Sequence, residues 1–337
     1  MHKPMPRKEG TPSHDAIPDP DRAVLFEPWR HRYALAVAIA AAALLAAGGL
    51  VTSTGSGLAV PDWPLSFGQV FPPMVGGVLY EHGHRMIASM VGLMTMILMF
   101  WFRAREPRPA VRWLAYAAFF GVVAQGILGG MTVLMRLPIA VSVAHACLAQ
   151  VVFCLLVTLA LVTSRRFIAA SASRSTAPQR QLGRLSAAGT GLVFVQLFLG
   201  ALMRHSGAGL AIPDFPLSFG HLVPPQFDAD IAIHFAHRVG ALVVSFVVVL
   251  IAVRAMRQGR SELAGPARLA LALVVLQVSL GAISVLTRLA VIPTTIHLLV
   301  GALLLATLMV LTIRAFQPGG AEVHAADQVG TPVEGAI

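Results

Sequence analysis

The sequence predicts an all-α integral membrane protein whose eight transmembrane helices form two tandem, pseudo-symmetric four-helix bundles. The first observation is composition: hydrophobic residues make up 56% of the 337 positions, charged residues make up 12%, and the mean hydropathy is +0.75. These values lie far outside the range of water-soluble domains. The second observation is a duplication, because GLAVPDWPLSFG at residues 57–68 returns 152 residues later as GLAIPDFPLSFG, with ten of twelve positions identical. Such a repeat predicts two copies of one structural unit.

Eight apolar runs are long enough to cross a bilayer as helices. In chain order they cover residues 33–51, 82–102, 113–134, 139–163, 185–203, 233–253, 270–286 and 292–313. Each repeat has four runs, and an even number inserts both copies the same way up, related by a pseudo-two-fold axis along the membrane normal. The predicted parts are an N-terminal tail (1–32), a first bundle (33–163), a linker (164–184), a second bundle (185–314) and a C-terminal tail (315–337).

The positions of the 25 Lys and Arg residues predict the orientation in the membrane. Twenty of them lie in the N-terminal tail, the linker, two alternate loops and the last helix end, whereas the opposite loops hold only Arg136, Arg204 and Arg288. Arg85 and Arg238 lie near helix ends on that opposite side. By the positive-inside rule we expect both termini in the cytoplasm and the two repeated loops outside. About thirty polar, Pro-rich residues precede the first run, so we expect no cleavable signal peptide.

Two histidines in each repeat fall inside apolar runs at matched positions. His84 and His145 lie within the first two turns of helices that run inward, which places both roughly 3 to 10 Å below the outer boundary at 1.5 Å rise per residue. His237 and His297 repeat the arrangement. An imidazole in hydrocarbon is costly unless it is paired, and two inward histidines at one level of a four-helix bundle predict the axial ligands of a haem.

Two other roles for these histidines remain open. Each could hydrogen-bond a neighbouring helix, which suits a lone histidine better than four in a duplicated frame. Zinc or copper would need a third or fourth ligand, for which the second repeat offers only His234. Haem needs two ligands and a slot lined by small residues. Candidates for that slot are Gly126, Gly129, Gly130, Gly281 and Ala282.

A carboxylate accompanies the first histidine pair only. Glu81 precedes His84 by three residues, so on a helix it shares a face with that imidazole and is expected to point at whatever the imidazole binds. The matching position in the second repeat is His234, and His82 should point elsewhere. We therefore predict chemistry in the first bundle with Glu81 as a catalytic residue, and a permanent haem in the second. An anion stabilised at a helix N-terminus is the alternative role for Glu81.

Four arginines lie near the two predicted haem sites. Arg136 and Arg288 occupy matched short outer turns, and Arg85 and Arg238 directly follow two of the histidines. Haem propionates need cationic partners, which makes all four candidates, while snorkelling to the interface is the alternative.

The repeated loops combine Pro, Gly, Asp and aromatic residues, so we expect a rigid lid over each bundle. Asp62 and Asp214 should accept hydrogen bonds from loop backbone groups. Cys147 and Cys154 lie in an apolar run and are expected to be small packing residues.

These residues and their order resemble the haem A synthase family. The run 81–85, EHGHR, is similar to that family's ExxHR motif, and the tandem repeats, the PDWP-type loop and the later histidines agree with it over about residues 33–313. The resemblance implies an oxidoreductase that converts haem O to haem A for cytochrome oxidase by successive hydroxylation of a ring methyl to a formyl group. It implies haem b on His237 and His297, and the substrate haem O on His84 and His145, with Glu81 at the reacting face.

Many bacterial members of that family carry a cysteine pair in an outer loop, and this chain has none, so it resembles the cysteine-free branch. The implied setting is a bacterial inner (cytoplasmic) membrane, with haem O delivered by a haem O synthase and a membrane electron donor. A homo-oligomer is compatible with the sequence. The net charge of +10 reflects basic residues gathered on one side of the membrane, so we expect no nucleic-acid partner.

Two other functional classes remain open. A bis-histidine cytochrome that only transfers electrons would use the four histidines without needing Glu81. A transporter with parallel repeats would more often show helices broken by Gly or Pro at mid-membrane and coupling carboxylates there, and neither feature is found in the sequence.

Overall fold

The computed structural model describes residues 26–169 and 177–317. Within these ranges, eight helices are long and apolar enough to cross a membrane, which confirms the predicted number and makes the chain a multi-pass membrane protein. They are α1 (Pro28–Ser53), α2 (Gly77–Arg105), α3 (Pro109–Leu134), α4 (Ile139–Val162), α6 (Ala177–Ser206), α7 (Ala229–Arg257), α8 (Ser261–Leu286) and α9 (Val291–Phe316). The short helices α5 (Arg165–Ala169) and η2 (Ala208–Leu210) follow α4 and α6.

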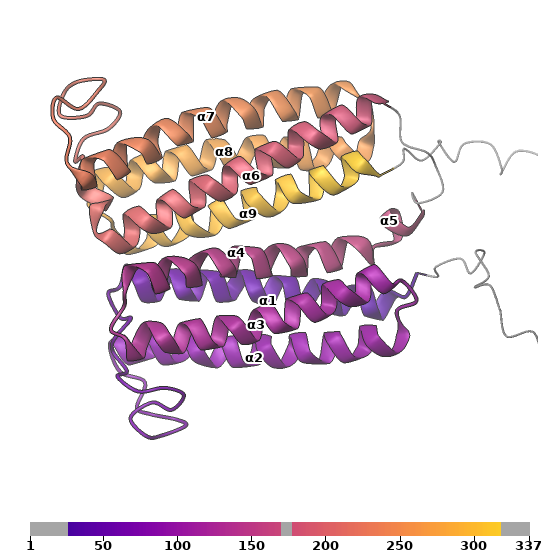
Figure 1. Cartoon of the computed structure of the whole chain (residues 1–337), viewed down its shortest axis with the longest axis horizontal. Coiled ribbons are helices and arrows are strands. Elements are labelled where there is room, and N and C mark those ends of the chain that lie inside the picture. The colour runs from indigo at the N-terminus through magenta and orange to yellow at the C-terminus, as the bar shows by residue number, and fades with distance from the viewer. Residues whose placement is uncertain (1–25, 170–176, 318–337) are drawn as a thin grey trace, which may run out of the picture.

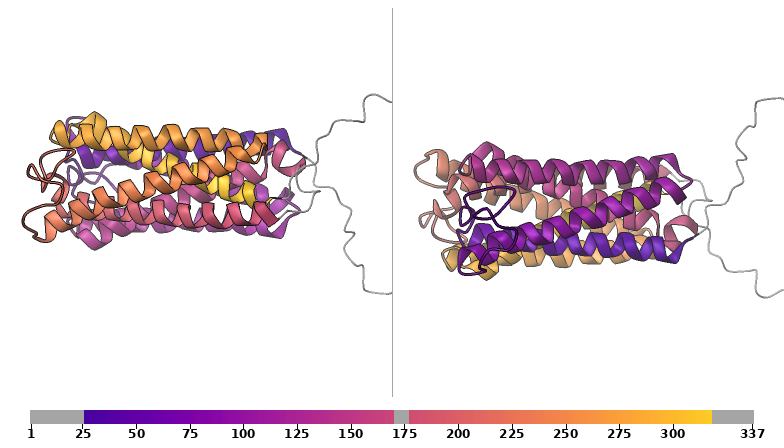
Figure 2. Two further views of the ribbon diagram at one scale, coloured as in Figure 1. Left: turned by 90° about the horizontal axis from the view of Figure 1, so that it is seen from above. Right: turned by 90° about the horizontal axis from the view of Figure 1, so that it is seen from below.

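The long helices form two groups of four (Figure 1). Helices α1 to α4 pack together as the first bundle, and α6 to α9 pack together as the second. The two long loops, 54–76 and 207–228, lie at the same end of the molecule, as two copies inserted the same way up require. We call this the loop end, and we call the opposite end, where α4 ends and α6 begins, the linker end. Figure 2 shows from two further sides that the long helices run near the long axis.

The bundles meet through α1, α4, α6 and α9. Gly49 of α1 permits close approach, because a Cβ there would lie 3.2 Å from Cγ2 of Thr295 on α9. Ala302 and Ala306 of α9 are buried together with the core of the first bundle, and Cys154 of α4 is buried with the core of the second. The two bundles therefore share packed side chains along their contact.

Most helices extend beyond the apolar runs that predicted them. Helix α6 begins at Ala177 and α8 at Ser261, eight and nine residues before the predicted starts at 185 and 270. Hydropathy detects only the part of a helix that faces hydrocarbon, whereas polar turns continue the helix into the headgroup region, where long side chains reach water. The predicted linker 164–184 accordingly includes α5 and the first turns of α6, and residues 28–32 of the predicted tail begin α1. Residues 315 and 316 of the predicted C-terminal tail continue α9, and residues 1–25 and 318–337 lie outside the described residues.

A buried ion cluster closes the first bundle at the linker end. Arg30 of α1 and Glu106, which follows α2, are each 2% exposed, and Arg30 Nη1 lies 3.4 Å from Glu106 Oε2. Arg108 Nε lies 2.6 Å from Glu106 Oε1, and its Nη1 donates to the carbonyl of Val162 at the end of α4. Burial acts to raise the pKa of Glu106, but the hydrogen bonds and charge of Arg108 and the charge of Arg30 outweigh it and hold that pKa below its ordinary value.

We expect acid to weaken this end of the first bundle. The pKa of Glu106 is lower in the folded protein than in the unfolded chain, where it is about 4.3. The ionised carboxylate therefore stabilises the folded protein fully above the unfolded-chain pKa, and this stabilisation is lost as pH falls through the folded-state pKa. Removing one partner of a buried pair costs about 3 to 5 kcal/mol, so Glu106→Gln should lower the apparent melting temperature in detergent at pH 7 and flatten its fall between pH 5 and pH 3.

The matched control is Glu262→Gln in the second bundle, whose side chain is 30% exposed beside Arg260. Its expected effect is below about 1 kcal/mol. Equal melting temperatures for Glu106→Gln and the parent at pH 7 would contradict a stabilising cluster.

Candidate functional site

The four predicted ligand histidines lie toward the loop end, one pair in each bundle. His84 on α2 and His145 on α4 belong to the first bundle, and His237 on α7 and His297 on α9 belong to the second. Each follows the first residue of its helix by six to eight positions, which corresponds to a depth of about 9 to 12 Å along the helix axis. The two histidines of each pair are near enough to interact electrostatically. The arrangement therefore places two imidazoles at one level of each bundle.

A glycine of the preceding helix lies against each imidazole ring. A Cβ at Gly48 would lie 3.1 Å from Cε1 of His84, and a Cβ at Gly200 would lie 3.0 Å from Cε1 of His237. For Gly129 and Gly281 the corresponding distances, to His145 and His297, are both 3.2 Å. Gly200 and Gly281 follow Gly48 and Gly129 by 152 residues each. The duplication has therefore kept the packing of every histidine together with its identity.

The slot predicted from small residues is only partly reproduced. Gly129 and Gly281 contact ligand histidines as described, and Gly126 has open space at its Cβ position. Gly130 instead makes room for the loop residue Trp63, because a Cβ there would lie 2.7 Å from Cδ2 of the indole. Gly48 and Gly200 were missed, although their 152-residue spacing was available as a signal.

Glu81 is 3% exposed, and both of its oxygens are hydrogen-bonded. The backbone N–H of Val60 donates to Oε2 at 2.8 Å, and Arg85 Nη2 donates to Oε1 at 2.6 Å. The sequence predicted a carboxylate directed at the partner of His84. In the structure its partners are instead the loop 54–76 and the next turn of α2, so Glu81 fixes the loop over the bundle.

The second bundle uses a different residue for the same contact. The N–H of Ile212 donates to Nδ1 of His234 at 3.2 Å, as the N–H of Val60 does to Glu81. Arg238 Nη2 donates to the carbonyls of Asp214 at 2.7 Å and Ile212 at 2.9 Å. A neutral ring therefore replaces the carboxylate while the arginine keeps its place. His234 is engaged by the loop, which does not favour it as a further metal ligand.

Arg85 is bound to the first loop as Arg238 is to the second. Nη1 of Arg85 donates to the carbonyl of Asp62 at 2.8 Å and to that of Leu65 at 3.0 Å. Arg136 and Arg288, the other propionate candidates, have exposed side chains in matched turns at the loop end. Both have positive φ, 60° for Arg136 and 52° for Arg288, so the turn geometry is duplicated as well.

The prediction for the loop aspartates is confirmed. Asp62 accepts from the N–H groups of Phe67 at 2.7 Å and Gly68 at 2.8 Å, and Asp214 makes the equivalent bonds in the second loop. The N–H of Gly68 and then that of Phe67 lower the pKa of Asp62. His82 points away from His84 as expected, because its Nδ1 lies 2.8 Å from Oγ of Ser66 in the loop.

Two residues for which the sequence predicted no contact join the bundles at the loop end. Arg204, near the end of α6, donates through Nη2 to the carbonyl of Thr52 on α1 at 2.9 Å. His205 is close enough to His145 of the first bundle to interact with it electrostatically. Residue 53, the counterpart of His205 in the first repeat, is a serine, so the duplication carried no signal for this contact.

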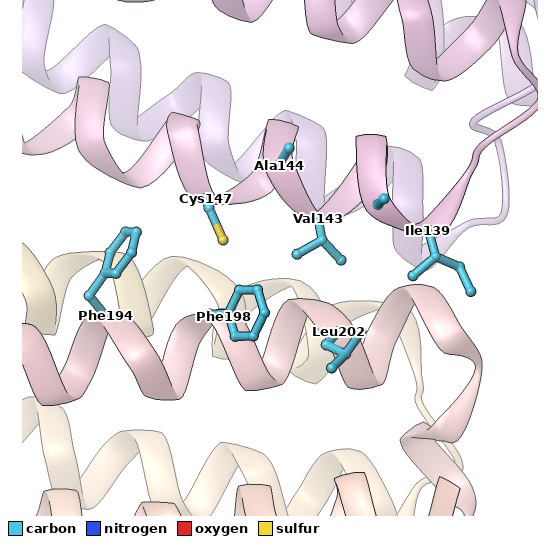
Figure 3. Close-up of a pocket in the computed structure, with 8 residues that line it drawn as sticks. Ile139, Val143, Ala144, Cys147, Phe194, Phe198 and Leu202 are labelled. Atoms are coloured by element: carbon cyan, nitrogen blue, oxygen red, sulfur yellow. The ribbon is translucent and has the colours of Figure 1, made fainter. Parts of the chain in front are cut away.

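An apolar pocket of about 560 Å³ lies between α4 and α6 (Figure 3). Its lining includes Ile139, Val143, Ala144 and Cys147 of α4 and Phe194, Phe198 and Leu202 of α6. His145 lies on the other side of α4, against Gly129, so this pocket is separate from the histidine pair. Cys147 and Cys154 are both free, as expected of packing residues.

The donor set fits haem better than a bare metal ion. Among the described residues, no group of three or more His, Cys, Asp or Glu side chains converges on one point. Each bundle offers two imidazoles, which is the number of axial positions on a haem iron. His297 Nδ1 donates to the carbonyl of Gln277 at 3.1 Å, which leaves Nε2 as the acceptor nitrogen and the candidate ligand atom. Nε2 of Gln277 lies 3.3 Å from that nitrogen and would have to move for His297 to bind iron.

Comparison with known proteins covers the four histidines and Glu81. The model of a family described as cytochrome oxidase assembly protein, COX15-CtaA, matches residues 76–309, which include Glu81 and all four histidines. A protein of Symbiobacterium thermophilum named heme A synthase is 34% identical over 272 residues, covering 78% of this chain and 89% of the relative. Proteins of the same name from Shouchella clausii and Geobacillus kaustophilus are 31% and 30% identical, covering 72% and 88% of this chain and 82% and 94% of the relatives.

Proposed function

Because the chain belongs to the COX15-CtaA family of cytochrome oxidase assembly proteins, we propose that its two bundles divide one oxidation between them. The activity is that of a haem A synthase, an oxidoreductase that converts haem O to haem A, as the names of its relatives indicate. In our proposal the first bundle receives haem O as substrate and the second retains haem b. The observation that carries this division is the matched histidine pair in each bundle, with a carboxylate, Glu81, beside the first pair only.

His84 and His145 would hold the substrate haem, and His237 and His297 would hold the resident haem. When bound, the haems supply the iron chemistry of electron transfer and oxidation. The protein orients the imidazoles: Gly48, Gly129, Gly200 and Gly281 leave room for the rings. The loops 54–76 and 207–228, which we call the lids, lie at the loop end of the two bundles. Asp62 and Asp214 fix the turns of these loops.

Glu81 is the proposed catalytic residue of the first bundle. Oxidation of a ring methyl removes hydrogen from its carbon, and a positioned carboxylate can accept a proton or stabilise positive charge as that carbon is oxidised. Glu81 lies three residues before His84 and is nearly buried, so it is shielded from bulk water. Arg85 compensates its negative charge at 2.6 Å. To take a substrate proton, Oε2 would exchange its bond from Val60 for one from the reacting group.

Arg136 and Arg288, whose side chains are exposed at the loop end, would bind haem propionates, one arginine in each bundle. These two arginines occupy equivalent positions in the two repeats, so each bundle would have an equivalent cationic partner for a propionate. Arg85 and Arg238 already donate to loop carbonyls and would support the same groups by holding the lid.

Haem analysis tests the activity directly. Expressed with a haem O synthase in a host that makes no haem A, the chain should yield haem A when extracted haems are separated by chromatography. The control is the same host with the haem O synthase alone, which should yield haem O. Recovery of haem O only, from cells that contain the folded protein, would contradict the proposal and favour a bis-histidine cytochrome that only transfers electrons.

We also propose that the loop end faces outward from a bacterial inner membrane and that both termini are cytoplasmic. The split of basic residues, twenty against three, supports this orientation. Leu222 is 84% exposed in the second long loop, so a cysteine introduced there should react in intact spheroplasts with a thiol reagent that cannot cross the membrane. Labelling only after the spheroplasts are lysed would reverse the topology. The parent, whose two cysteines lie within α4, is the control.

A further inference from the structure

The two bundles differ beside one ligand histidine in a way that the repeat makes visible. Gln196 of α6 reaches His237 of α7: its Nε2 lies 3.0 Å from Nδ1 of the ring and 2.8 Å from the carbonyl oxygen of the same residue. The residue 152 positions earlier is Leu44. In the first bundle Leu44 offers His84 only its backbone carbonyl, and Nδ1 of His84 has no hydrogen-bond partner of good geometry among the described residues.

A second difference makes room for the first. Gly240 lies three residues after His237, and a Cβ there would collide with Oε1 of Gln196. The residue three positions after His84 is Ile87. Two large apolar side chains in the first bundle are thus replaced by an amide and a glycine in the second. Because the glycine is what allows the amide to reach the histidine, the two replacements form one unit.

We propose that Gln196 is a positioning residue that fixes His237 and so makes the second bundle retain its haem, whereas the first bundle, with Leu44 in its place, releases its haem after oxidation. This inference rests on the proposed division between the bundles. An imidazole that binds iron through Nε2 carries its proton on Nδ1. A half-turn of the Gln196 amide presents Oε1 to that proton, in exchange for the bond to the His237 carbonyl.

The physical effect is that of an outer-shell partner on a ligand. A hydrogen bond to the non-ligating nitrogen fixes ring orientation and raises its basicity, and loss of such a partner typically lowers metal affinity by about 10- to 100-fold. The side chain of Leu44 cannot supply that bond, and only its backbone carbonyl faces His84. The first bundle therefore holds its histidine by packing and one backbone group, which suits a haem that must leave.

The test compares the full-length protein with Gln196→Leu, which gives the second bundle the residue of the first. We expect transfer of the resident haem to apomyoglobin to become about 10- to 100-fold faster, and the reduction potential of the low-spin haem to rise as its ligand becomes less basic. Gln196→Glu keeps an acceptor oxygen of similar reach and should restore slow release. The reciprocal double variant, Leu44→Gln with Ile87→Gly, should increase the amount of haem O that co-purifies.

A purely structural Gln196 would leave the potential unchanged and would not be rescued by glutamate. Wild-type release rate and potential in Gln196→Leu would overturn the inference while leaving the proposed function intact, provided that His237→Ala still loses the haem. If His237→Ala and His297→Ala also keep the haem, it is the division between the bundles that fails.

Discussion

His237→Ala and His297→Ala are each expected to remove the low-spin haem spectrum of the purified protein and to reduce its resident haem to a small fraction of the parent amount. Each substitution deletes one of two axial ligands, and alanine leaves a cavity in a bundle whose packing was built around a ring. Absorption spectra of the reduced protein and haem content per polypeptide measure the effect.

Two comparisons make this result specific. His221→Ala removes an exposed histidine from the loop of the same bundle and should leave the spectrum unchanged. His84→Ala should keep the resident haem and lose the capacity to make haem A. If both second-bundle variants keep the parent spectrum and haem content, then His237 and His297 are not the ligands.

The number of transmembrane helices could be predicted because a bilayer imposes a minimum apolar length and leaves few alternatives. The first residues of α6 and α8 could not, since their first polar turns lie where the bilayer no longer penalises charge. The loop contacts of Asp62 were predictable for a related reason: an aspartate in a Pro- and Gly-rich turn has local backbone donors within reach.

Contacts between the two bundles cannot be predicted from a local sequence pattern of this kind. Arg204 reaches the end of α1, and His205 lies near His145, although neither has a counterpart in the first repeat. Both follow from how the bundles dock, which depends on many apolar side chains at once. The bonds of Glu81 were missed for the same kind of reason, because the position of Val60 depends on the path of the whole loop.

The informative positions are those where the duplicated bundles differ. The lid, the turns and the four glycines are repeated, which indicates that both bundles keep the same way of holding a planar ligand. Among the differences between the repeats, two lie beside ligand histidines: Glu81 against His234, and Leu44 against Gln196 together with Ile87 against Gly240. A division between a reacting bundle and a retaining bundle accounts for the two together.

Glu81→Gln is expected to fold, to keep the resident haem, and to accumulate haem O or a partly oxidised intermediate in place of haem A. The amide has the shape of the carboxylate and can still accept from the N–H of Val60, so the lid should stay in place. It cannot accept a proton from the reacting methyl, and it loses the charge pair with Arg85. Loss of a general base typically costs about 100- to 10,000-fold in rate, a range that haem chromatography over a time course can detect.

Holding the lid requires only a hydrogen-bond acceptor at residue 81, whereas the proposed catalytic role requires a carboxylate. Two variants separate these roles. Glu81→His installs the residue that the second bundle uses to hold its loop, so it should preserve the lid and still fail in turnover. Arg85→Lys keeps a cation beside an intact carboxylate and should lose far less activity. If Glu81→His and Glu81→Gln both make haem A at the parent rate, Glu81 only anchors the loop. If Glu81→Gln loses the resident haem as well, the two bundles do not work as separate sites, because a change beside His84 would then control a ligand held by His237 and His297.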